Sequence, residues 1–163
     1  GVALHSQGRL LESIAAYRRA IELQSDFADT HYLMGTALDE TGERAEAISC
    51  YQQALALRPD FPEALGELGA IFVVSGEIER GAALLSRALA LQPGNAIVQI
   101  NISSALRLQG KVTEAFEGYR HALRLAPDSV DAIAGLADLL RGGLPARLER
   151  PDRATGGLWR ARL

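Results

Sequence analysis

The sequence has little of the material from which catalytic and metal sites are made. It contains one cysteine, Cys50, and three histidines among 163 residues. A single cysteine excludes a disulfide within the chain. His5, His31 and His121 each stand without a second ligand one helical turn away, which excludes the usual spacing of a zinc site. We therefore expect no metal, no cofactor and no catalytic residues in this chain.

Aromatic residues, a strong net charge and long apolar runs are also missing. Aromatic side chains make up 6% of the residues, and the net charge is −3, which is too small to indicate a nucleic-acid surface. No apolar run approaches the roughly 18 residues that a membrane-spanning helix needs. We expect neither nucleic acid nor a membrane span, and the lone cysteine favours a reducing compartment such as the cytoplasm.

What the sequence does have is a period of 34 residues, which is typical of stacked helical repeats. Three sets of residues return with that spacing: Gly8, Gly42, Gly76 and Gly110; Ala20, Ala54, Ala88 and Ala122; and Pro59, Pro93 and Pro127. The glycines favour a left-handed cap at the end of one helix, and the prolines cannot continue the next. With apolar residues three and four apart, this pattern predicts helices at 9–24, 28–40, 43–57, 62–74, 77–91, 96–108, 111–125 and 130–141.

The segment 28–61 shows the repeat most completely, with small and large residues alternating along two helices. Its conspicuous positions are His31, Met34, Gly35, Leu38, Ala47, Tyr51, Ala54 and Pro59. This pattern resembles the tetratricopeptide repeat, and it returns in phase in 62–95 and 96–129. The resemblance implies an all-α, right-handed superhelical solenoid of antiparallel helix pairs, with about four repeats and incomplete ends.

The resemblance covers residues 1–141, as a partial repeat at 1–27, three full repeats at 28–61, 62–95 and 96–129, and a half repeat at 130–141. Because the chain begins inside a repeat, we expect a piece of a longer protein. Residues 142–163 leave the phase and are rich in glycine, proline and arginine, so we predict a basic, disordered tail. A short helix at 145–150 that covers the last repeat is the alternative.

In tetratricopeptide arrays the first helix of each pair lines a concave groove. The resemblance therefore implies a protein–protein interaction scaffold that binds a peptide or partner segment there and is not itself an enzyme. We call the surface formed by these positions the groove face. It comprises Asp29, Tyr32, Leu33, Thr36, Asp39, Glu63, Glu67, Ala70, Val73, Ile97, Ile100, Asn101, Ser104, Arg107 and Leu108, extended by Asp131, Ala134 and Asp138.

The groove face predicts the chemistry of a partner. Acidic residues dominate it, and Ile97, Ile100 and Leu108 add aliphatic side chains, so a protein segment with basic and apolar residues is expected. Two alternatives stay open. The chain could be the substrate-recruiting module of a larger enzyme of the glycosyltransferase or sulfotransferase type, since similar repeats are often joined to such domains. It could also self-associate through its unpaired last helix.

Overall fold

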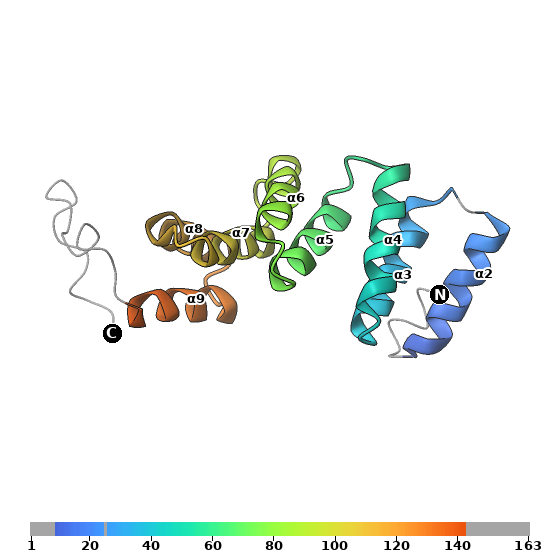
Figure 1. Ribbon diagram of the computed structural model, residues 1–163, viewed down its shortest axis with the longest axis horizontal. Coiled ribbons are helices and arrows are strands. Elements are labelled where there is room, and N and C mark those ends of the chain that lie inside the picture. Colours follow the sequence, from blue (N-terminus) through green and yellow to red (C-terminus); the bar gives the residue numbers. More distant parts are fainter. Residues whose placement is uncertain (1–8, 25, 143–163) are drawn as a thin grey trace, which may run out of the picture.

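The computed structural model describes residues 9–24 and 26–142 (Figure 1). Within these residues all regular structure is α-helical. Each helix matches its predicted range to within one residue at either end, so the fold class is confirmed. The helices are α2 (Leu10–Leu23), α3 (Ala28–Glu40), α4 (Arg44–Leu57), α5 (Pro62–Val74), α6 (Ile78–Leu91), α7 (Ala96–Leu108), α8 (Val112–Leu125) and α9 (Val130–Arg141).

Three glycines reverse the chain inside the helix pairs. Gly42, Gly76 and Gly110 have φ angles of 86°, 90° and 74°, in the left-handed region where a residue without a Cβ atom is favoured. After α3, the backbone N–H of Glu43 donates to the Leu38 carbonyl at 2.8 Å, and the backbone N–H of Gly42 donates to the Asp39 carbonyl at 3.0 Å. These two bonds form the Schellman cap, which confirms the predicted role of the glycines.

The helices stack as antiparallel pairs in chain order, from α2 at one end of the array to α9 at the other (Figure 1). Pairs α3–α4, α5–α6 and α7–α8 each pack internally and against the next pair. We call α3, α5, α7 and α9 the leading helices and α4, α6 and α8 the trailing helices. Leading helices of successive repeats also touch, α5 against α7 and α7 against α9.

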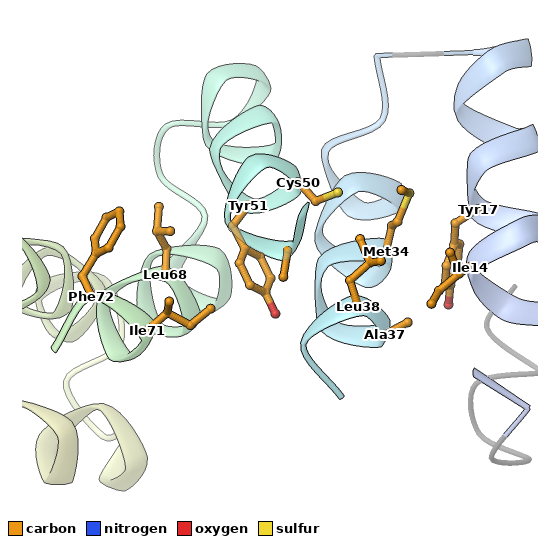
Figure 2. Packing of buried hydrophobic residues seen from close by; sticks show 11 residues of the cluster. Ile14, Tyr17, Met34, Ala37, Leu38, Cys50, Tyr51, Leu68, Ile71 and Phe72 are labelled. Atoms are coloured by element: carbon orange, nitrogen blue, oxygen red, sulfur yellow. The ribbon is translucent and has the colours of Figure 1, made fainter. Parts of the chain in front are cut away.

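The core runs along the array between the helices instead of forming one central cluster. Figure 2 shows part of it, where Ile14 and Tyr17 of α2 face Met34 and Leu38 of α3, and Tyr51 of α4 lies between α3 and α5. Burying a leucine such as Leu38 stabilises the fold by roughly 1.5–3 kcal/mol. The recurring alanines Ala54, Ala88 and Ala122 are all fully buried, because a larger side chain would separate the helices at these positions.

The small residue that allows close packing of a helix pair lies on the leading helix in some repeats and on the trailing helix in another. In the first full repeat, a Cβ atom added to Gly35 of α3 would lie 2.8 Å from the Tyr51 ring of α4. In the third repeat Ser103 replaces that glycine on the leading helix, and the trailing helix supplies Gly118 directly opposite. The Ser103 hydroxyl donates to the Gln99 carbonyl at 2.7 Å. The close approach of the helices is kept although the small residue has moved.

The array ends differently from its middle. Among the described residues α9 has no trailing helix, and Val130, Ile133 and Leu140 are 76%, 51% and 56% exposed. Ile133 and Leu140 occupy the repeat positions of Leu65 and Phe72, which the trailing helix buries in the second repeat. The predicted tail lies outside the described residues apart from Gly142, as do residues 1–8 of the partial first repeat.

Candidate functional site

A hollow of about 450 Å³ lies between α7 and α9. It is lined by Ile97, Ile100, Asn101, Ser104, Arg107, Tyr119, Ser129, Asp131, Ala134, Gly135 and Asp138. All but Tyr119 and Ser129 come from the leading helices, and eight of these form four pairs 34 residues apart, such as Ile97 with Asp131 and Ser104 with Asp138; Arg107 is the ninth. The groove-face positions of two successive repeats therefore meet around one opening.

The aliphatic part of this hollow exists because a polar contact of the earlier repeats is missing. In the first full repeat Arg58 donates two hydrogen bonds to Asp29, at 3.1 and 2.5 Å. In the second, Gln92 Nε2 donates to Glu63 at 2.9 Å. The third repeat has Ile97 at this position, 71% exposed. Because Ile97 lies at the edge of a concave surface, it adds apolar contact area to the hollow.

Polar groups surround the aliphatic part. The Ser104 and Tyr119 hydroxyls share a hydrogen bond of 2.8 Å, and Asp138 pairs with Arg141. The Nε atom of Arg107 is buried and has no hydrogen-bond partner within the described residues. Asp131 likewise has neither a hydrogen bond nor an ion pair within them. The hollow thus offers donors, one carboxylate without a partner and an aliphatic surface.

The acidic part of the groove face lies on α3 and α5. Asp39 pairs with Arg44 at 3.4 Å, whereas Glu67 makes no ion pair or hydrogen bond in the part of the chain that the structure describes. Glu67 is exposed at the surface, but partial desolvation by the neighbouring helices, and then the charge of Asp39, raise the pKa of its carboxyl. Burial is also the main cause of the raised pKa of Tyr32, followed by the charge of Glu67. Glu67 therefore lies among groups that disfavour its negative charge.

Three aromatic side chains pack together beside these acids in the first full repeat. The Tyr32 ring lies 6.0 Å from the Tyr51 ring and 5.0 Å from the Phe61 ring, centroid to centroid. The Arg58 guanidinium stands 4.5 Å over Phe61 while it binds Asp29. These contacts hold Tyr32 and Asp29 in the repeat itself, so Asp29 is an ion-pair partner within the fold and not a free acid of the groove face.

The structure gathers only part of the predicted groove face into a hollow. Ile97, Ile100, Asn101, Ser104 and Arg107 line it together. The remaining predicted residues lie elsewhere on the leading helices, at their surface or partly buried: Asp29, Tyr32, Leu33, Thr36, Asp39, Glu63, Glu67, Ala70 and Leu108.

Two predicted exposures are wrong. Val73 is 5% exposed and belongs to the core, since Gly81 of α6 lets the trailing helix close over it. Ile100 is 8% exposed and presents only an edge to the hollow, because α8 and α9 cover the rest of it.

Sequence reasoning missed three residues that line the hollow, Tyr119, Ser129 and Gly135. Tyr119 is a core residue by its repeat position, and it is 1% exposed. It still lines the hollow, because Gly135 stands where the preceding leading helices have Asn101 and Glu67. A Cβ atom at Gly135 would collide with the Tyr119 ring. A glycine at a groove-face position is the signal that could have found this contact.

Comparison with known proteins assigns the family. A family model described as Tetratricopeptide repeat matches residues 32–96 and 71–130, and one described as TPR repeat matches residues 1–42. The chain belongs to the tetratricopeptide repeat (TPR) family. No curated protein matches its sequence.

Solved structures agree with the TPR fold at low sequence identity. One crystal structure of MamA protein superposes with a TM-score of 0.77 at 20% identity, covering 87% of this chain and 78% of that one. PilF of Pseudomonas aeruginosa gives 0.77 at 23% identity, covering 87% and 65%. The first TPR of Spaghetti (RPAP3), bound to the HSP90 peptide SRMEEVD, gives 0.66 at 20% identity, covering 71% and 91%.

The described residues show no sign of other kinds of site. They contain no group of three or more His, Cys, Asp or Glu side chains arranged to hold a metal ion. None of the helices described is both long and apolar enough to cross a bilayer. Cys50 is buried, and burial raises the pKa of its thiol, so it is a poor nucleophile.

Proposed function

We propose that this TPR array is a protein-interaction scaffold that binds an extended segment of a partner protein across its groove face, and that it is not itself an enzyme. The observation that carries the proposal is the hollow between α7 and α9, with Ile97 exposed at its edge. Aliphatic surface in a concave site is where burial supplies most of the binding free energy.

The polar groups around the hollow suit the main chain of such a segment. Asn101 and Ser104 supply an amide and a hydroxyl, and Arg107 adds guanidinium donors. Together these groups can form hydrogen bonds with both the N–H and the C=O groups of an extended backbone. Helix α7, which carries all three groups, is held on both sides by neighbouring helices. A stiff site loses little conformational entropy when it binds.

Charge supports a partner segment with basic as well as apolar side chains. Glu63, Glu67 and Asp131 lie on the groove face and make no ion pair within the described residues, whereas Asp29, Asp39 and Asp138 are already paired with arginines. Charge of this sign speeds the encounter with basic segments and disfavours acidic ones. The TPR of Spaghetti was solved with a peptide, which supports peptide binding by this fold. Its peptide carries acidic residues, whereas the groove face here favours the opposite charge.

Selection of random peptides tests the proposal. The full chain is immobilised, and twelve-residue peptides from a display library are selected in low salt. The peptides recovered are then measured against two variants by fluorescence polarisation. Ala134→Arg fills the hollow from α9, and Ala90→Arg places the same side chain on α6, where Ala90 is exposed outside the hollow.

We expect Ala134→Arg to lower the affinity for the selected peptides by about tenfold or more, which corresponds to about 1.4 kcal/mol of binding free energy. Ala90→Arg leaves them unchanged. Circular dichroism of both variants checks that the helices are retained. Recovery of no peptides, or equal binding to both variants, contradicts the proposal.

A further inference from the structure

Two acidic side chains on the groove face differ from the others because they have no hydrogen-bond or ion-pair partner among residues 9–24 and 26–142. Asp29, Asp39 and Asp138 each pair with an arginine, and Glu63 accepts a hydrogen bond from Gln92. Glu67 of α5 and Asp131 of α9 make no such contact within the described residues. A carboxylate that the fold has paired contributes little to a ligand, since its existing partner must first be displaced.

These two carboxylates flank the aliphatic side chain. Helix α7, which carries Ile97, contacts α5 on one side and α9 on the other. Glu67, Ile97 and Asp131 therefore lie on three successive leading helices as acid, aliphatic, acid, with Glu67 at the repeat position of Asn101, one helical turn further along its helix than Ile97 and Asp131. Asp131 and Ile97 both line the hollow, and Glu67 lies on the helix next to it.

We infer that the groove face reads a basic, aliphatic, basic pattern in an extended partner segment, with the two basic side chains about three residues to either side of the aliphatic one. This inference rests on the proposed function. Packed helices lie roughly 8–10 Å apart, and an extended chain advances about 3.3 Å per residue. One helix spacing therefore corresponds to about three residues. The helical turn of about 6 Å by which Glu67 is offset from the repeat position of Ile97 leaves the diagonal distance at about three to four residues of extended chain.

Each of the three side chains in the pattern contacts a different part of the groove face. The aliphatic side chain covers Ile97 and enters the hollow, where Ile100 and Tyr119 present their edges. A basic side chain over Glu67 relieves a carboxylate whose ionisation is opposed by partial desolvation and by Asp39. The other basic side chain meets Asp131, which makes no ion pair within the described residues although Arg107 lines the same hollow. Because both charge contacts are at the surface, they weaken as salt rises.

The probe is a nine-residue peptide blocked at both ends, Ser-Arg-Ser-Thr-Leu-Ser-Thr-Arg-Ser. Two control peptides accompany it. One has both arginines replaced by glutamate, and the other is Ser-Ser-Thr-Arg-Leu-Arg-Ser-Thr-Ser, which has the same composition with the arginines next to the leucine. Binding to the full chain is followed by amide chemical shifts in low salt, which detects weak ligands and reports which helices respond.

Reversing the charge of the two carboxylates should change which peptide is preferred, the arginine probe or the glutamate peptide. Loss of structure alone would weaken the binding of both. The variant Glu67→Lys with Asp131→Lys is compared with Glu79→Lys with Glu114→Lys, which makes the same change in net charge on trailing helices at exposed positions. We expect the first variant to lose about tenfold in affinity for the arginine probe and to bind the glutamate peptide better than the wild type does. The second variant changes both affinities much less.

The results separate this inference from the function on which it rests. Equal binding of the probe and its same-composition isomer, or an arginine preference that survives in the Glu67→Lys, Asp131→Lys variant, overturns the charge pattern alone. If selected peptides still depend on the hollow through Ala134→Arg, the scaffold function then stands. If they do not, the scaffold function falls as well.

Discussion

Replacing Gly81 of α6 by alanine has two opposing effects on the free energy of unfolding. Alanine is the better helix former by about 1 kcal/mol in a helix interior, and the equivalent residues Ala47 and Ala115 show that the repeat accepts it. In this pair, however, an added Cβ atom would lie 2.6 Å from the Gly69 carbonyl oxygen and 2.8 Å from the Val73 backbone nitrogen. Backbone atoms of α5 cannot move aside as a side chain can.

Overpacking of this kind costs about 1–3 kcal/mol, so Gly81→Ala should lower the free energy of unfolding by about 1 kcal/mol after the gain in propensity. Gly66→Ala in α5 is the matched control. Its added Cβ atom meets only Val98 Cγ2 at 3.4 Å, an ordinary contact. Gly66→Ala should therefore raise the free energy of unfolding by up to about 1 kcal/mol.

Urea unfolding followed by circular dichroism at 222 nm measures both variants. The two should differ by about 2 kcal/mol, or by several degrees in Tm for an array of this size. If Gly81→Ala is as stabilising as Gly66→Ala, the close approach of α5 and α6 does not limit side-chain size, and the packing argument fails.

Three further predictions concern stability and pH. Ala88→Leu should overpack a fully buried site and lower the free energy of unfolding by about 1–3 kcal/mol, whereas Ala90→Leu on the exposed side of α6 should leave it nearly unchanged in the same urea assay. Gly118→Ala should destabilise the α7–α8 pair through contact with Ser103, and the double variant with Ser103→Gly should recover part of the loss; simple additivity would contradict the contact. Partial desolvation and Asp39 raise the pKa of Glu67 in the folded protein, so its ionisation disfavours folding above that pKa and has no effect below its unfolded pKa of about 4.3. Glu67→Gln should therefore be slightly more stable than wild type at neutral pH, with the difference vanishing in acid; an equal difference at both pH values would contradict the assignment.

The helices and their pairing were predictable because their signals are local and repeated. Gly42, Gly76 and Gly110 end the first helix of each pair through a backbone conformation that glycine favours, and the prolines end the second. A 34-residue period then places every leading helix in the same role. These signals do not depend on which side chains meet, so the phase alone was enough to predict the boundaries.

The exposure of individual side chains was less predictable, because it depends on neighbours in other helices. Asp39, Val73 and Arg107 share one repeat position, yet Val73 is buried because Gly81 lets α6 approach. Asp29 looked free in the sequence, but Arg58 lies 29 residues later and reaches it. The hollow itself depends on Tyr119 and Gly135, two residues whose contact the repeat pattern does not show.

Several predictions are not tested by the structure and stay predictions. They are the disordered tail at 142–163, the cytoplasmic location, self-association through α9 and membership of a larger enzyme as its recruiting module. Truncation after Arg141 with a measurement of Tm tests the first, because removing a disordered tail should leave the melting of the array almost unchanged.

A selected peptide carrying a nitroxide label tests the central claim most directly. Paramagnetic broadening of amide signals falls steeply with distance, so it reports where on the array the peptide lies. We expect the strongest broadening at Asn101, Ser104 and Ala134 beside the hollow, and much weaker broadening at Ala90 of α6 and Thr113 of α8. Broadening centred on the trailing helices, with the signals of the hollow unchanged, would contradict binding across the groove face.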